Sequence, residues 1–70
     1  MEDLRVVTPL EERRRLRGLT QQELSVKAGV PEREISLIEQ LYLIPRMKTQ
    51  LKLADALGIP VEPLFSKWPA

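Results

Sequence analysis

The chain has 70 residues, and its 11 Lys and Arg nearly balance its 10 Asp and Glu, which leaves a net charge of +1. It contains no cysteine and no histidine, so disulfides and Cys/His zinc sites are excluded, and we expect no metal or cofactor. No run approaches the roughly 18 apolar residues of a membrane span, and the acidic start lacks the basic region of a secretory signal. We therefore expect a cytoplasmic protein that makes no membrane contact.

The first predicted helix follows residues 1–7, which we expect to be an N-terminal arm that frays. Thr8 has the hydroxyl of a helix N-cap, Pro9 suits the first helical position, and Glu11 completes a capping box. Gly18 can adopt the left-handed conformation that ends a helix. The pattern predicts a helix that begins at Pro9 and ends near Gly18.

The second predicted helix is short and ends in a tight turn. Thr20 suits the N-cap position, and Glu23 follows three residues later, which predicts a helix over residues 21–28. Gly29 can close this helix after two turns. The next helix must therefore begin almost at once.

Each of the next two predicted helices carries one apolar stripe. Pro31 can occupy the first position of a helix over residues 31–41. Its stripe consists of Ile35, Ile38 and Leu41. A further helix ends at Gly58, and its stripe consists of Met47, Leu51, Ala54 and Leu57. Residues 59–65 are expected to form a short last helix whose Leu64 and Phe65 close the core.

These elements predict an all-α fold, a compact five-helix bundle in a single domain over residues 1–70. Its parts are the arm (1–7), a helical core (8–66) and a C-terminal tail (67–70). The most specific signal is a helix-turn-helix within residues 21–40, because two short helices that cross steeply need a small residue, a glycine and apolar residues at set places. The chain supplies Leu24, Ser25, Ala28, Gly29, Val30, Ile35 and Ile38.

Four segments carry a resemblance to a known family: Leu19-Thr20-Gln21-Gln22-Glu23-Leu24, Ala28-Gly29-Val30, Ile35-Ser36-Leu37-Ile38-Glu39 and Leu53-Ala54-Asp55-Ala56-Leu57-Gly58-Ile59. They resemble the XRE family, the Cro and phage-repressor class, over nearly the whole chain. The resemblance implies a lambda-repressor-like domain that binds double-stranded DNA as a small transcriptional regulator, with its third helix in the major groove. We expect sequence-specific binding by a homodimer on a near-palindromic site, with repression favoured over activation.

The same resemblance implies a set of DNA-binding residues. Gln21 matches the position that hydrogen-bonds a phosphate, although Gln21 and Gln22 also suit an ordinary solvated helix face. Arg33 can bind guanine O6 and N7 with two hydrogen bonds, and a surface ion pair with a neighbouring glutamate is the alternative. By the same mapping, the groove-facing residues are Pro31, Glu32, Arg33, Ser36, Leu37 and Gln40. Because this chain lacks the basic residues that relatives have after the third helix, we expect Lys27, Arg46 and Lys48 to bind phosphates together with Gln21 and Gln22.

One structural contact is also implied. Arg14 and Glu39 match positions that form a partly buried ion pair in phage repressors. The resemblance therefore implies that this pair joins the first helix to the recognition helix, and that removal of one partner leaves a poorly solvated charge.

The chain departs from the family pattern in three places. Arg13 stands where relatives usually place an apolar residue, and Leu16 stands where they often place a charged one. Glu32 and Glu34 suit the positive end of a helix dipole but oppose the approach of a phosphate. Residues 41–44 form an apolar run where relatives usually have a glycine and basic residues. Part of this run must extend the core, and any exposed part would mark a protein contact.

The expected dimer surface consists of Val61, Leu64, Phe65 and Trp68, although the Trp68 ring could instead fold back over the core. An alternative function is a protein-interaction module of the same fold, which would use the acidic third helix and residues 41–44. An enzyme is not expected, because the chain has no His or Cys and no glycine-rich phosphate loop. Repression and activation both stay open, as do phage, toxin–antitoxin, restriction–modification and host settings.

Overall fold

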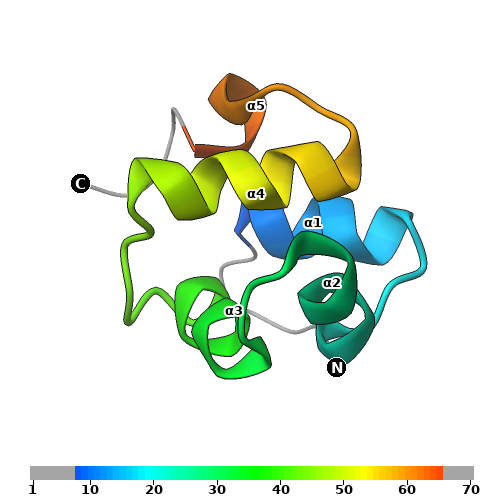
Figure 1. Cartoon of the computed structure of the whole chain (residues 1–70), viewed down its shortest axis with the longest axis horizontal. Helices are drawn as coiled ribbons and strands as arrows, with labels where there is room; N and C mark the ends of the chain where they lie inside the picture. The colour runs from blue at the N-terminus through cyan, green and yellow to red at the C-terminus, as the bar shows by residue number, and fades with distance from the viewer. Residues whose placement is uncertain (1–7, 66–70) are drawn as a thin grey trace, which may run out of the picture.

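Five α-helices make up residues 8–65, the part of the chain that this computed structural model describes (Figure 1). They are α1 (Pro9–Leu16), α2 (Gln21–Ala28), α3 (Glu32–Glu39), α4 (Met47–Leu57) and α5 (Val61–Phe65). The expected all-α class and five-helix bundle are confirmed. None of these helices combines the length and the apolar character that crossing a bilayer requires. The predicted arm over residues 1–7 and the tail over residues 67–70 lie outside the described residues.

The first two helices begin where their capping residues predict. The Thr8 hydroxyl accepts a hydrogen bond from the Glu11 backbone N–H at 3.1 Å, and Pro9 holds the first helical position. Thr20 and Glu23 form a complete capping box, with a bond of 3.0 Å from the Glu23 N–H to the Thr20 hydroxyl and one of 2.8 Å from the Thr20 N–H to the Glu23 carboxylate. The bond from the Thr20 N–H lowers the pKa of Glu23, because it stabilises the ionised carboxylate.

Helix α3 is shorter than predicted at both ends. Pro31 is the N-cap, with φ −55° and ψ 138°, so the helix begins one residue later, at Glu32. Beyond the C-cap residue Gln40, Leu41 adopts a left-handed φ of 67°. A residue in this conformation cannot continue a right-handed helix, so Leu41 leaves the predicted apolar stripe and its side chain is exposed.

The apolar face predicted for α4 is wrong in its first half. Met47 and Leu51 are 61% and 55% exposed, whereas Leu53, two residues further along, is fully buried. The helix carries two overlapping apolar stripes, both of which include Ala54 and Leu57. Packing against α2 and α5 selects the stripe that contains Leu53, which leaves Met47 and Leu51 facing outward.

The core lies where α4 crosses the other helices. In Figure 1, α4 runs across the middle of the domain, with α2 and α3 below it and α5 above it. The buried apolar side chains are Leu10, Leu24, Val30, Ile35, Ile38, Leu53, Ala54, Ala56, Leu57, Leu64 and Phe65. Leu64 and Phe65 therefore close the core as predicted. Their assignment to an exposed dimer surface is wrong, because a side chain buried within one copy offers no area to a second.

Candidate nucleic-acid interface

Gly29 produces the bend between α2 and α3. Its φ of 71° and ψ of 32° are left-handed, and its N–H donates to the Ser25 carbonyl at 2.9 Å. The Val30 N–H donates to the same carbonyl at 3.3 Å, and the Val30 side chain is buried beneath the turn. Glycine adopts this conformation without the steric penalty of a Cβ. The two helices are therefore separate elements joined at a fixed angle.

Helix α3 has a buried inner face and an accessible outer face. Ile35 and Ile38 are fully buried on the inner face and fix the helix to the domain. On the outer face, Arg33 is exposed and forms no ion pair within residues 8–65, so the predicted alternative of a surface ion pair is not observed. The other groove-facing candidates lie on or beside this outer face: Pro31, Glu32 and Gln40 are exposed, and Ser36 and Leu37 are half-buried.

The start of α2 and the outer face of α3 border one shallow groove. The side chains that line it are Gln21, Glu32, Arg33, Ser36 and Leu37. All five belong to the predicted DNA-binding set. Gln21 comes from α2, and the other four come from α3. At the side of the groove, the Gln40 amide donates to the Ser36 hydroxyl at 2.8 Å.

The remaining predicted phosphate contacts lie on two other elements. Gln22 and Lys27 are exposed on α2. Arg46, the N-cap of α4, and Lys48 in its first turn are exposed and line a second groove together with Glu34 and Ile44. The basic side chains are thus distributed around the outer face of α3 rather than gathered on it.

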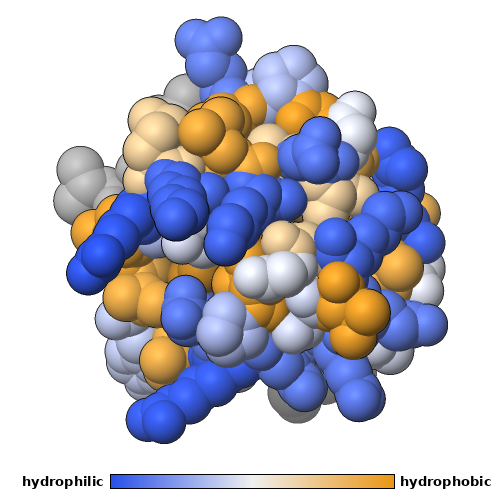
Figure 2. Space-filling model, viewed as in Figure 1, coloured by the Kyte–Doolittle hydropathy of each residue, from blue (hydrophilic) through white to orange (hydrophobic). Residues whose placement is uncertain are grey.

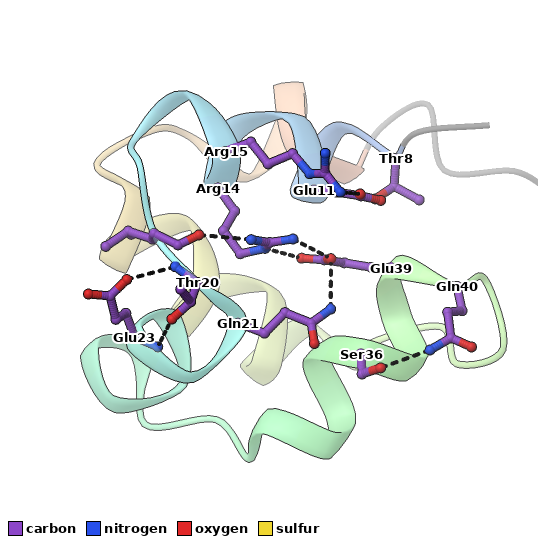
Figure 3. Close-up of polar contacts among 11 residues, drawn as sticks. Thr8, Glu11, Arg14, Arg15, Thr20, Gln21, Glu23, Ser36, Glu39 and Gln40 are labelled. Atoms are coloured by element: carbon purple, nitrogen blue, oxygen red, sulfur yellow. Dashed lines mark hydrogen bonds and ion pairs between the residues drawn. The ribbon is translucent and has the colours of Figure 1, made fainter. Parts of the chain in front are cut away.

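A buried ion pair joins α1 to the C-terminal end of α3 (Figure 3). The Arg14 Nε donates to Glu39 Oε2 at 2.7 Å, and its Nη2 donates to Glu39 Oε1 at 3.0 Å. Arg14 Nη1 donates to the Leu19 carbonyl at 2.8 Å, so three guanidinium nitrogens have partners. The hydrogen bonds to Glu39 raise the pKa of Arg14 above its ordinary value. The structure therefore contains the contact that the resemblance implies.

Glu39 also binds Gln21, a contact that sequence reasoning missed. The Gln21 Nε2 donates to Glu39 Oε1 at 3.0 Å, and Figure 3 shows the amide directed at the carboxylate from the start of α2. The two residues are 18 positions apart, on different helices. No spacing rule relates them, because their approach depends on the angle at Gly29.

The unusual residues of α1 and α3 occupy accessible positions. Helix α1 directs Leu10 and Arg14 inward, which leaves Arg13 and Leu16 exposed. Glu32 is exposed and Glu34 is half-buried in the first turn of α3, where the helix dipole favours a negative charge. These two carboxylates lie close to the face that carries Arg33.

The apolar run after α3 is only partly buried. Leu43 packs against the core and Pro45 is buried, whereas Tyr42 is 78% exposed and Ile44 is also exposed. Figure 2 shows hydrophobic surface over the segment between α3 and α4. The expectation that part of this run extends the core is confirmed, and the rest forms an exposed apolar patch beside α3.

Comparisons with known proteins agree with this geometry. A model of the helix-turn-helix family matches residues 10–64. A crystal structure of the restriction-modification controller protein C.AhdI from Aeromonas hydrophila is 32% identical, with a TM-score of 0.78, and the match covers 81% of this chain and 86% of that one. A comparison with curated proteins found no match. The chain belongs to the XRE-type helix-turn-helix family of DNA-binding transcription regulators.

Proposed function

We propose that this chain binds duplex DNA in a sequence-specific manner as a small cytoplasmic transcriptional repressor. The observation that carries the proposal is the outer face of α3, where Arg33 is exposed and free of ion pairs within residues 8–65. Ile35 and Ile38 hold the opposite face, so the helix can enter a major groove without unfolding. Gln21 borders the same groove from α2.

The contacts divide into base reading and phosphate binding. Arg33 reads a guanine through O6 and N7, which discriminates against the wrong base by about 1–3 kcal/mol. The neighbouring base-facing residues are Pro31, Glu32, Ser36, Leu37 and Gln40. Phosphates are bound by the remaining polar and basic positions, Gln21, Gln22, Lys27, Arg46 and Lys48. Glu32 and Glu34 stabilise the start of α3 through the helix dipole, but they repel phosphates and so lower the affinity for DNA.

We also propose that two copies bind together on a near-palindromic site, with half-sites about one helical turn apart. Because Leu64 and Phe65 are buried, we place the dimer surface on the exposed side of α4 instead. Met47 and Leu51 are four residues apart and therefore lie on one face of that helix. The likeness to a restriction-modification controller favours a similar setting for this chain.

Selection of bound sites from random duplex DNA tests the proposal. The full chain should enrich one near-palindromic sequence. An Arg33→Ala variant should bind weakly and lose its preference at one base position in each half-site, because the other contacts stay in place. Enrichment of no sequence by the unaltered chain, or an unchanged preference in the variant, would contradict the assignment of Arg33.

A second candidate function is a protein-interaction module of the same fold. The observation that favours it is the exposed patch after α3, which includes Tyr42 and Ile44. This candidate predicts no binding of duplex DNA even at low salt. The DNA-binding proposal predicts binding that weakens steeply as salt rises.

A further inference from the structure

The Glu39 carboxylate on α3 accepts hydrogen bonds from side chains of α1 and α2. Its side chain is 3% exposed and lies near the end of α3. One oxygen accepts from Arg14 Nε, and the other accepts from both Arg14 Nη2 and Gln21 Nε2. The ion pair with Arg14 fixes the carboxylate, and the carboxylate in turn holds the first residue of α2.

This contact determines which way the Gln21 amide faces. An ionised carboxylate only accepts hydrogen bonds, so the nitrogen of the amide, and not its oxygen, must face Glu39. An amide nitrogen carries two N–H groups, and one bond to Glu39 leaves the second able to donate elsewhere. Gln21 lines the groove beside Arg33, at the N-terminal end of α2. An anion at that end also meets the positive end of the helix dipole.

We propose that Glu39 is a positioning residue for DNA binding, because it holds the Gln21 amide with its nitrogen toward the carboxylate and its second N–H ready for a phosphate oxygen. The inference rests on the proposed function. A side chain that is ordered before binding loses less conformational entropy when the complex forms. Loss of the Glu39 acceptor should therefore weaken phosphate binding even though Glu39 itself touches no DNA.

Two matched double variants of the full chain isolate the acceptor. Arg14→Met/Glu39→Gln and Arg14→Met/Glu39→Leu both remove the ion pair and leave the net charge unchanged. Only the glutamine variant keeps an oxygen that can accept from Gln21. Binding is measured with a mixed-sequence duplex of about 20 base pairs at low salt, where phosphate contacts dominate. Thermal unfolding is followed in parallel, and each double variant is also made with Gln21→Ala.

The leucine variant should bind the duplex about five-fold more weakly than the glutamine variant, the effect of one ordered hydrogen bond. Gln21→Ala should weaken the glutamine variant by at least this factor and weaken the leucine variant by less, because the Gln21 amide is no longer held in place there. Equal binding by the two folded double variants would overturn the positioning role, while duplex binding by the unaltered chain would leave the proposed function intact. No duplex binding by the unaltered chain would overturn both.

A second measurement does not depend on the stability of the variants. Nuclear magnetic resonance relaxation of the Gln21 side-chain amide in the unaltered free chain should show it as ordered as the neighbouring backbone, whereas the Gln22 amide, which is exposed, should be mobile. Equal mobility of the two amides would overturn the proposal.

Discussion

Arg14 and Glu39, 25 residues apart in the chain, form a buried ion pair through two hydrogen bonds of 2.7 and 3.0 Å. This pair fixes the end of α3 to α1, while Ile35 and Ile38 fix its inner face to the core. The outer face of α3 is thus presented on a helix that is held at both its side and its end.

The first prediction concerns this pair. Arg14→Ala and Glu39→Ala should each lower the free energy of unfolding by about 3 kcal/mol, because each leaves one buried charge without its partner. The double variant should lose clearly less than the sum of the two, since no unpaired charge remains. Thermal unfolding of the four proteins in the cycle measures this coupling. Purely additive losses would show that the two side chains do not act as a pair.

The second prediction concerns two residues that share one backbone conformation. Gly29 has φ 71° and Leu41 has φ 67°. Gly29→Ala should lower the free energy of unfolding by about 1 kcal/mol through left-handed strain alone, because nothing lies within 4 Å of the added Cβ. Leu41→Gly should raise it by about 0.5 kcal/mol, because the strain relieved exceeds the entropy that glycine loses on folding.

Urea unfolding measures both changes. Gly18→Ala is the matched control, because Gly18 has φ 68° and equally open surroundings, and it should cost as much as Gly29→Ala. A stabilising effect of Gly29→Ala would contradict the left-handed bend on which the two-helix arrangement depends.

The third prediction separates stability from DNA binding at the start of α3. Glu32→Gln/Glu34→Gln should tighten duplex binding by about 1 kcal/mol at low salt, because two carboxylates no longer repel phosphates. The same change should lower the free energy of unfolding by about 0.5 kcal/mol per residue, because the helix dipole loses its negative partners. Fluorescence anisotropy with labelled duplex and thermal unfolding measure the two effects. Unchanged or weaker duplex binding would place the acidic turn away from DNA.

The fourth prediction concerns the proposed dimer surface on α4. Leu51→Lys should shift the chain toward monomer in sedimentation equilibrium, because a charge would be buried against the second copy. Val26→Lys is the matched control, since Val26 is also exposed but lies on α2, and it should leave the dimer unchanged. A chain that is monomeric without any substitution would contradict the proposed surface.

The parts of the fold that local chemistry determines could be predicted from sequence. Thr8 and Thr20 satisfy backbone groups within three residues of themselves, and Gly29 and Gly58 end their helices through their own conformations. Leu41 could not be predicted in this way, because leucine rarely adopts a left-handed conformation.

Features that depend on packing could not be predicted to the same extent. Helix α4 has two overlapping apolar stripes in sequence, and its contacts with α2 and α5 decide that Leu53 is buried and Leu51 is exposed. At the candidate site, the outward position of Arg33 follows from the buried isoleucines of its helix. The bond between Gln21 and Glu39 does not follow from any spacing, because it depends on the angle between α2 and α3.

The most direct test of DNA binding by this chain is a titration of duplex DNA with the full chain at increasing salt. The logarithm of the binding constant should fall linearly with the logarithm of salt concentration, with a slope of about −0.9 for each phosphate neutralised. Arg46→Gln/Lys48→Gln should make that slope shallower, because two phosphate contacts are lost. A chain that binds no duplex at low salt, or whose binding does not change with salt, would contradict the account.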